Sequence, residues 1–107
     1  MAEILGGLQL RLLGPNRISL AQPGLRPGEN VWTYWTFRPD PSHFTVTVTV
    51  VPDWPDLGGP GPSLAVQETF VERNLDATII HANVVNRGNE AVMGFEVNVS
   101  FIEPAPA

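Results

Sequence analysis

The chain of 107 residues contains no cysteine, and this absence excludes several kinds of site at once. Disulfide frameworks, thiolate metal sites and cysteine nucleophiles all require a sulfur atom that the sequence does not supply. A small secreted domain without disulfides depends on its hydrophobic core alone, which favours an intracellular or particle-associated setting. Because extracellular β-sandwich modules also often lack cysteine, the sequence leaves the compartment open.

Lysine is absent too, and six arginines against eleven acidic residues give a net charge of −5. An acidic surface does not attract phosphate backbones, so we expect no nucleic-acid partner. The sequence also lacks an uninterrupted apolar run of about 18 residues, the length that indicates a membrane-spanning helix. Glu3 and the polar residues that follow it are not typical of a signal peptide. We therefore expect neither a membrane span nor a leader in this sequence.

Helical periodicity is missing as well, and a strict alternation of apolar and polar side chains takes its place. Residues 43–51, HFTVTVTVV, place Phe44 and three valines on one face and three threonines on the other. Residues 95–102, FEVNVSFI, repeat the pattern. A period of two is typical of a β-strand with one buried face. The strands expected elsewhere cover residues 4–13, 17–20, 31–37, 64–73 and 77–85, and the last strand begins at Val92.

Turn-forming residues separate these strands at short intervals. Gly14-Pro15-Asn16 predicts a turn, and two Pro-Gly pairs predict a rigid connection over residues 21–29. Six to seven short strands predict a single all-β domain over residues 1–107, an antiparallel β-sandwich that is immunoglobulin-like or jelly-roll-like. The Thr/Val strand at residues 43–51 is expected inside a sheet, because at an edge it would invite aggregation. If it is an edge strand, a partner subunit should cover it, which favours an oligomer.

Residues 31–50 and 77–99 follow the same order: an apolar strand, a polar loop and then F-x-V-x-V. Two such segments can pack face to face about a pseudo-twofold axis. Any two β-hairpins share alternation, however, so the sequence leaves open whether the segments are a true internal repeat.

Residues 76–102 contain V-x-N-x-G-N at residues 84–89 and F-x-V-x-V at residues 95–99. This segment resembles the central hairpin of CARDB-type, immunoglobulin-like bacterial adhesion domains. The resemblance implies a non-catalytic binding or adhesion module, in which the asparagines and the glycine close a turn. Several strands follow the hairpin in that family, whereas here a short tail follows it. A complete sandwich must therefore recruit the N-terminal strands in a different order, or borrow strands from a neighbouring subunit.

Aromatic residues crowd the strand at residues 31–37, VWTYWTF. Alternation sends Trp35 and Phe37 to one face of this strand. It sends Trp32 and Tyr34 to the other face, and a two-layer sandwich buries only one of these pairs. Exposed rings in this position can stack on sugars or dock another protein. Alternatively, the loop at residues 52–63 or the N-terminal segment covers Trp32 and Tyr34.

Asp53, Trp54 and Asp56 form a second candidate site in the proline- and glycine-rich loop at residues 52–63. Two aspartates beside a tryptophan can accept hydrogen bonds from sugar hydroxyls while the ring stacks on the sugar. A solvated turn with Trp54 packed on the sandwich explains the same residues. Calcium is not expected, because it takes about 6–8 oxygen ligands and two aspartates supply few of them.

No other residues indicate catalysis or a bound cofactor. The histidines, His43 and His81, lack the spacing of a metal-ligand set, so hydrogen bonds to strand neighbours are the expected role. The serines lie in no G-x-S-x-G context, and no glycine-rich loop precedes a helix that would hold phosphate. We therefore expect no enzyme, no metal and no cofactor.

These observations favour a non-catalytic interaction or assembly module that associates with itself through sheet edges or through its aromatic face. In the alternative, a carbohydrate-binding module or small lectin, three rings stack on a glycan and two carboxylates bind its hydroxyls. The residues of that site are Trp32, Tyr34, Asp53, Trp54 and Asp56. The expected partners are a second copy of the chain, another protein or a glycan.

Overall fold

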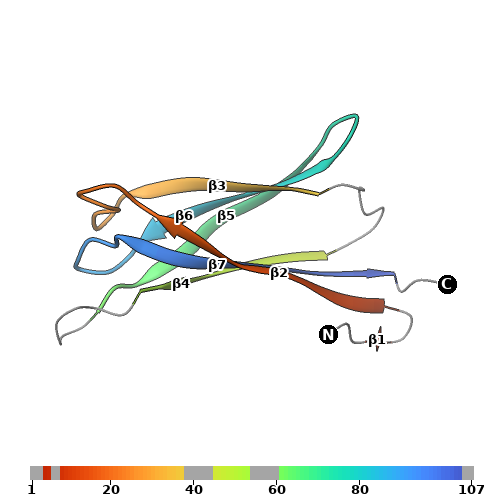
Figure 1. Cartoon of the computed structure of the whole chain (residues 1–107), viewed down its shortest axis with the longest axis horizontal. Coiled ribbons are helices and arrows are strands. Elements are labelled where there is room, and N and C mark those ends of the chain that lie inside the picture. Colours follow the sequence, from red (N-terminus) through yellow and green to blue (C-terminus); the bar gives the residue numbers. More distant parts are fainter. Residues whose placement is uncertain (1–3, 6–7, 38–44, 54–60, 105–107) are drawn as a thin grey trace.

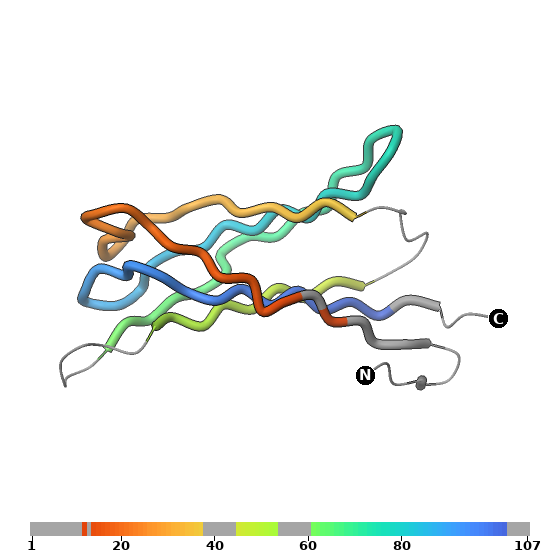
Figure 2. The backbone as a smooth tube through the Cα atoms, viewed as in Figure 1, coloured from red at the N-terminus to blue at the C-terminus, as the bar shows by residue number. Residues whose placement is uncertain are grey.

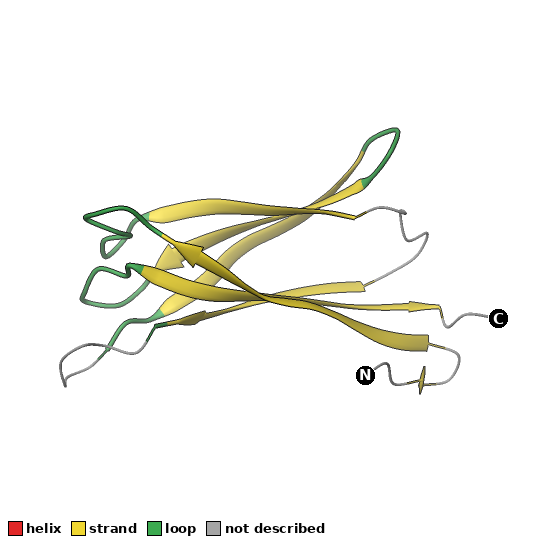
Figure 3. Cartoon of the chain, in the orientation of Figure 1, coloured by secondary structure: helices red, strands yellow, loops and turns green. Residues whose placement is uncertain are grey.

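The structure is a computed structural model that describes residues 4–5, 8–37, 45–53 and 61–104. Every paired strand in it runs antiparallel to its neighbour. The described part of the chain contains strands and loops and no helix (Figure 3). The prediction of an all-β sandwich of six to seven strands is confirmed. The strands are β1 (Ile4–Leu5), β2 (Leu8–Ser19), β3 (Asn30–Phe37), β4 (Thr45–Pro52), β5 (Leu64–Arg73), β6 (Thr78–Asn86) and β7 (Gly94–Pro104).

The strands form two sheets that face each other as two layers (Figure 1). The order in one sheet is β1-β2-β7-β4, and the order in the other is β3-β6-β5. Apolar side chains from both sheets meet between the layers. There the Phe37 ring on β3 packs edge-on against the Phe101 ring on β7, with 5.3 Å between the ring centroids. The buried core comprises Leu25, Phe37, Val48, Ile80, Ala82, Val84, Val92, Phe95, Val97, Val99 and Phe101.

Strand β7, and not the Thr/Val strand β4, lies at the centre of the four-stranded sheet. Phe95, Val97, Val99 and Phe101 on β7 are all at most 1% exposed. Because β2 pairs with one side of β7 and β4 with the other, β4 ends at the edge of the sheet. The prediction that the Thr/Val strand lies inside a sheet is therefore wrong. Alternation of apolar and polar residues indicates that one face of a strand is buried, but it does not indicate whether the strand lies at the centre or the edge of a sheet.

The predicted turn at Gly14-Pro15-Asn16 is also wrong, because β2 continues through these residues. The β2–β7 register runs from Leu13 opposite Val99 to Asn16 opposite Val97, so two residues of β2 oppose one of β7. This irregularity is a β-bulge, which bends the strand without ending its pairing. Gly14 has a φ of +117°, a conformation that favours glycine, and a Cβ there would meet the Val97 carbonyl at 2.9 Å.

Residues 76–102 do not form a hairpin, because β6 and β7 belong to different sheets. Each of the two similar segments, 31–50 and 77–99, instead crosses from the three-stranded sheet to the four-stranded sheet. Their first strands, β3 and β6, pair antiparallel, and so do their second strands, β4 and β7. The two segments therefore lie side by side, paired within both sheets, and not face to face.

The sheet order matches an immunoglobulin sandwich with one strand exchanged. Immunoglobulin strands A, B, E and D form one sheet and C, F and G the other. Strands β3 to β7 take the places of B to F, and β2 pairs with β7 where G pairs with F (Figure 2). An N-terminal strand, β2, thus completes the four-stranded sheet beside β7. Among the described residues, no strand lies beside β3 in the place of strand A.

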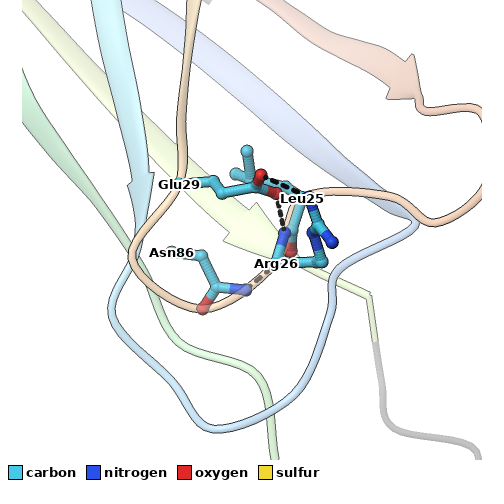
Figure 4. Close-up of polar contacts among 4 residues, drawn as sticks. All are labelled: Leu25, Arg26, Glu29 and Asn86. Atoms are coloured by element: carbon cyan, nitrogen blue, oxygen red, sulfur yellow. Dashed lines mark hydrogen bonds and ion pairs between the residues drawn. The ribbon is translucent and has the colours of Figure 1, made fainter.

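The Asn86 side chain holds two connections together at one end of the sandwich, and Figure 4 shows its contact with Leu25 in the first of them. Its amide donates to the Leu25 carbonyl and to the Glu90 carbonyl, both at 2.8 Å, and its oxygen accepts from the Gly88 N–H. Leu25 also exchanges backbone hydrogen bonds with Val92. These contacts fix the rigid connection predicted at residues 21–29, which leads the chain from β2 to β3.

Candidate functional site

The aromatic residues of β3 divide between the two faces of the sheet as alternation predicts. Phe37 is buried, and the partly buried Trp35 packs against the core. Trp32 is 48% exposed and Tyr34 is 69% exposed on the outer face. The alternative in which another part of the chain covers both rings does not hold among the described residues.

Two further rings join Trp32 and Tyr34 on the outer face of the three-stranded sheet. The register sets His81 of β6 between Tyr34 of β3 and Phe70 of β5. Phe70 stacks on His81 at 4.3 Å, and Trp32 meets the Phe70 ring edge-on at 5.6 Å. Tyr34 lies 6.3 Å from His81. We call these four residues the aromatic face.

Hydrogen bonds hold the polar groups beside these rings. His81 Nε2 lies 3.0 Å from Glu72 Oε1, which agrees with the role expected for a strand histidine. Asn83 accepts from Gln67 and donates to Asn30, so the bonds link all three strands. Among the residues that the structure describes, no three histidine or acidic side chains are placed to hold a metal ion.

Sequence reasoning missed Phe70 because a bulge in β5 reverses its direction. Val66 pairs with Val84, which faces the core, whereas Glu68 pairs with Asn83, which faces outward. The extra residue between them is Gln67. Strict alternation from Val66 would point Phe70 into the core, and the bulge turns it to the solvent. The sequence around Gln67 carries no glycine or proline that signals this shift.

Asp53 lies apart from the aromatic face, at the end of β4 in the other sheet. The Arg17 guanidinium on β2 reaches across β7 and donates to both carboxylate oxygens of Asp53. Gly94 lies beneath this pair, where a Cβ would come within 2.9 Å of Asp53 Oδ2 and closer still to Arg17. The structure therefore does not bring Asp53 together with Trp32 and Tyr34.

Trp54 and Asp56, the other two predicted residues of the glycan site, lie outside the described residues. Of the three predicted site residues that the structure describes, Trp32 and Tyr34 share one face and Asp53 lies apart from them.

The Arg17–Asp53 pair predicts a stability difference that depends on pH. The hydrogen bonds from Arg17 hold the pKa of Asp53 below its usual value. A carboxyl whose pKa is lower in the folded state stabilises the fold above its unfolded pKa, about 3.9, and this contribution is lost as the pH falls through the folded value. We expect Asp53→Asn to lower the urea midpoint at pH 7, and this difference from the wild type to shrink as the pH falls below the unfolded pKa and the carboxyl becomes protonated in both states. A difference that persists unchanged at the acid end would contradict the ion pair.

Strand β3 is also an edge of its sheet, and no strand in the described part of the chain pairs with its outer side. Its sequence, NVWTYWTF, has no charged residue and no proline over eight residues. A depression of about 440 Å³ lies where this edge begins, lined by Leu20 and Leu25 from the connection and by Val31 from β3. The opposite edge of the same sheet, β5, carries Glu68, Glu72, Arg73 and the bulge. Charges and bulges are the devices that keep sheet edges from pairing, and β3 has neither.

Within the described part of the chain, no helix is long and apolar enough to cross a membrane. Comparisons with protein-family models, with characterised proteins and with solved structures find no match to this chain.

Proposed function

We propose that this protein is a non-catalytic assembly module that associates with itself through the edges of its sheets. The observation that carries this proposal is that each sheet ends in an eight-residue edge strand without a charged residue, β3 in one and β4 in the other. Exposed edge strands present unpaired N–H and C=O groups that template pairing with another chain. Strand β4 has one protective residue, Pro52, at its last position, and β3 has none.

The exposed rings support the same proposal. Aromatic residues are enriched in the centres of protein interfaces, and two exposed rings of the aromatic face belong to the edge strand β3 itself.

A glycan-binding surface is the second candidate, because Trp32 and Tyr34 are exposed on one face. Two observations favour assembly over it. Phe70 and His81 stack on each other, so one face of each ring is already covered. The carboxylate of Asp53, proposed to bind sugar hydroxyls, is paired with Arg17 on the other sheet.

Self-association predicts a solution mass well above that of the 11.6 kDa monomer. Light scattering over a range of protein concentrations should show this mass, and it should rise with salt because each copy carries a net charge of −5. Titration of the same sample with a glycan panel should leave tryptophan emission unchanged. A monomer at all concentrations would refute the proposal, and a glycan-dependent emission shift that Trp32→Ala abolishes would favour the lectin.

A further inference from the structure

The open edge of β3 is formed by the backbone groups of every second residue. Where β3 begins, the Asn86 N–H donates to the Glu29 carbonyl, so Glu29 points towards β6. In an antiparallel ladder, residues bonded to the partner strand alternate with residues whose N–H and C=O groups point away from it. The residues whose backbone groups point away from β6 are therefore Asn30, Trp32, Tyr34 and Thr36.

Between Asn30 and Thr36, the side chains of β3 are similar in polarity on the two sides of Thr33. Moving away from Thr33 in both directions, the chain has two aromatic residues, then two apolar residues, then two polar residues. These pairs are Trp32 and Tyr34, Val31 and Trp35, and Asn30 and Thr36. A strand with this symmetry is complementary to an antiparallel copy of itself.

We propose that two copies of the chain pair antiparallel along β3, about a two-fold axis at Thr33. The pairing joins the two three-stranded sheets into one sheet of order β5-β6-β3-β3-β6-β5 and satisfies the open backbone groups of both copies. This inference rests on the proposed self-association and assigns it to one edge and one axis.

Both faces of the joined sheet gain contacts that the single copy lacks. On the outer face, Trp32 of each copy lies opposite Tyr34 of the other, and cross-strand aromatic pairs stabilise sheets. On the inner face, Val31 lies opposite Trp35, and both are partly buried residues at the margin of the core. Like charges do not meet, because β3 contains none.

A second copy fits the β3 edge better than it fits the β4 edge. The β4 edge lies close to β5 of the same chain (Figure 1). Strand β3 has β6 on one side, and no described strand lies on its other side. The outer face of β4 carries Thr45, Thr47 and Thr49 in place of rings. Threonine pairs offer less apolar area than the aromatic pairs at β3.

Matched lysine variants test the choice of edge. Tyr34→Lys places a charge in the seam but replaces a side chain that is 69% exposed in the single copy, so the fold should survive and urea unfolding of the monomer should confirm it. We expect its dimer dissociation constant, measured by light scattering or sedimentation, to rise at least about 30-fold. Thr47→Lys, at the middle of β4, should change the constant by less than about threefold. The reverse result would overturn the β3 seam and leave self-association standing.

Cysteine pairs test the axis, because the chain has no cysteine of its own. In the proposed dimer, Asn30 lies opposite Thr36 of the other copy, and directly opposed residues of a hydrogen-bonded pair have Cα atoms about 5.5 Å apart, a distance that suits a disulfide. Under mild oxidation, a mixture of Asn30→Cys and Thr36→Cys should give a cross-linked dimer, and each variant alone should not.

The control mixture is Thr45→Cys with Thr49→Cys, the corresponding pair on β4, and it should not cross-link. Cross-linking in this control alone, or none in the β3 mixture while the wild type stays dimeric, would overturn the proposed axis. A wild type that is monomeric at all concentrations would overturn both this inference and the proposed function.

Discussion

Replacement of Phe95 by alanine should remove a large part of the free energy of unfolding. Phe95 lies on the central strand β7 and is 0% exposed. A phenylalanine-to-alanine change in a packed core costs about 3–5 kcal/mol, from lost burial and from the cavity that remains. Because the free energy of unfolding of a small domain is about 5–15 kcal/mol in total, we expect a large fall in the urea midpoint and in the melting temperature.

Phe70→Ala is the matched control, since the same side chain is removed from the solvent-facing side of β5. Phe70 is 43% exposed, and neighbours can relax into the space that it leaves. Its loss should cost about 1 kcal/mol, mainly from its contacts with Trp32 and His81. Equal losses in the two variants would show that the core does not lie between the two sheets as described.

Asn86→Ala should have the second-largest effect, although asparagine adds little to a hydrophobic core. The Asn86 side chain is 1% exposed and holds three backbone groups, the carbonyls of Leu25 and Glu90 and the N–H of Gly88. A buried polar group that loses its partner costs about 1–3 kcal/mol, so we expect a destabilisation of about 3 kcal/mol. Chemical denaturation measures it directly.

The control for Asn86 lies three residues away in the same connection. Asn89 is exposed, and Asn89→Ala should change the free energy of unfolding by less than about 0.5 kcal/mol. If Asn86→Ala were equally mild, the connections at this end of the sandwich would not depend on the Asn86 side chain. Hydrogen exchange at Leu25 and Val92, which exchange backbone hydrogen bonds, would then stay slow in the variant.

Local patterns in the sequence predicted the strands and the two faces of β3. Alternation placed Trp32 and Tyr34 on the face opposite Trp35 and Phe37, because successive side chains of an extended strand point in opposite directions whatever their neighbours are. The structure showed that Phe37 is buried and that Trp32 and Tyr34 are exposed. The same local rule failed at the bulges. Gly14 looked like a turn and Gln67 gave no signal, since an extra residue in a strand is defined by the register of the strand opposite it.

The composition and alternation of this chain by themselves determined an all-β sandwich and which side chains of β3 share a face. The tertiary structure alone decided the order of the strands, and with it the three features on which the proposals depend. Pairing of β2 with β7 left β3 and β4 at sheet edges, and the bulge in β5 brought Phe70 to the aromatic face. Asp53 lies in the other sheet, where it pairs with Arg17. Each of these results from contacts between residues far apart in the chain, which a pattern of period two does not encode.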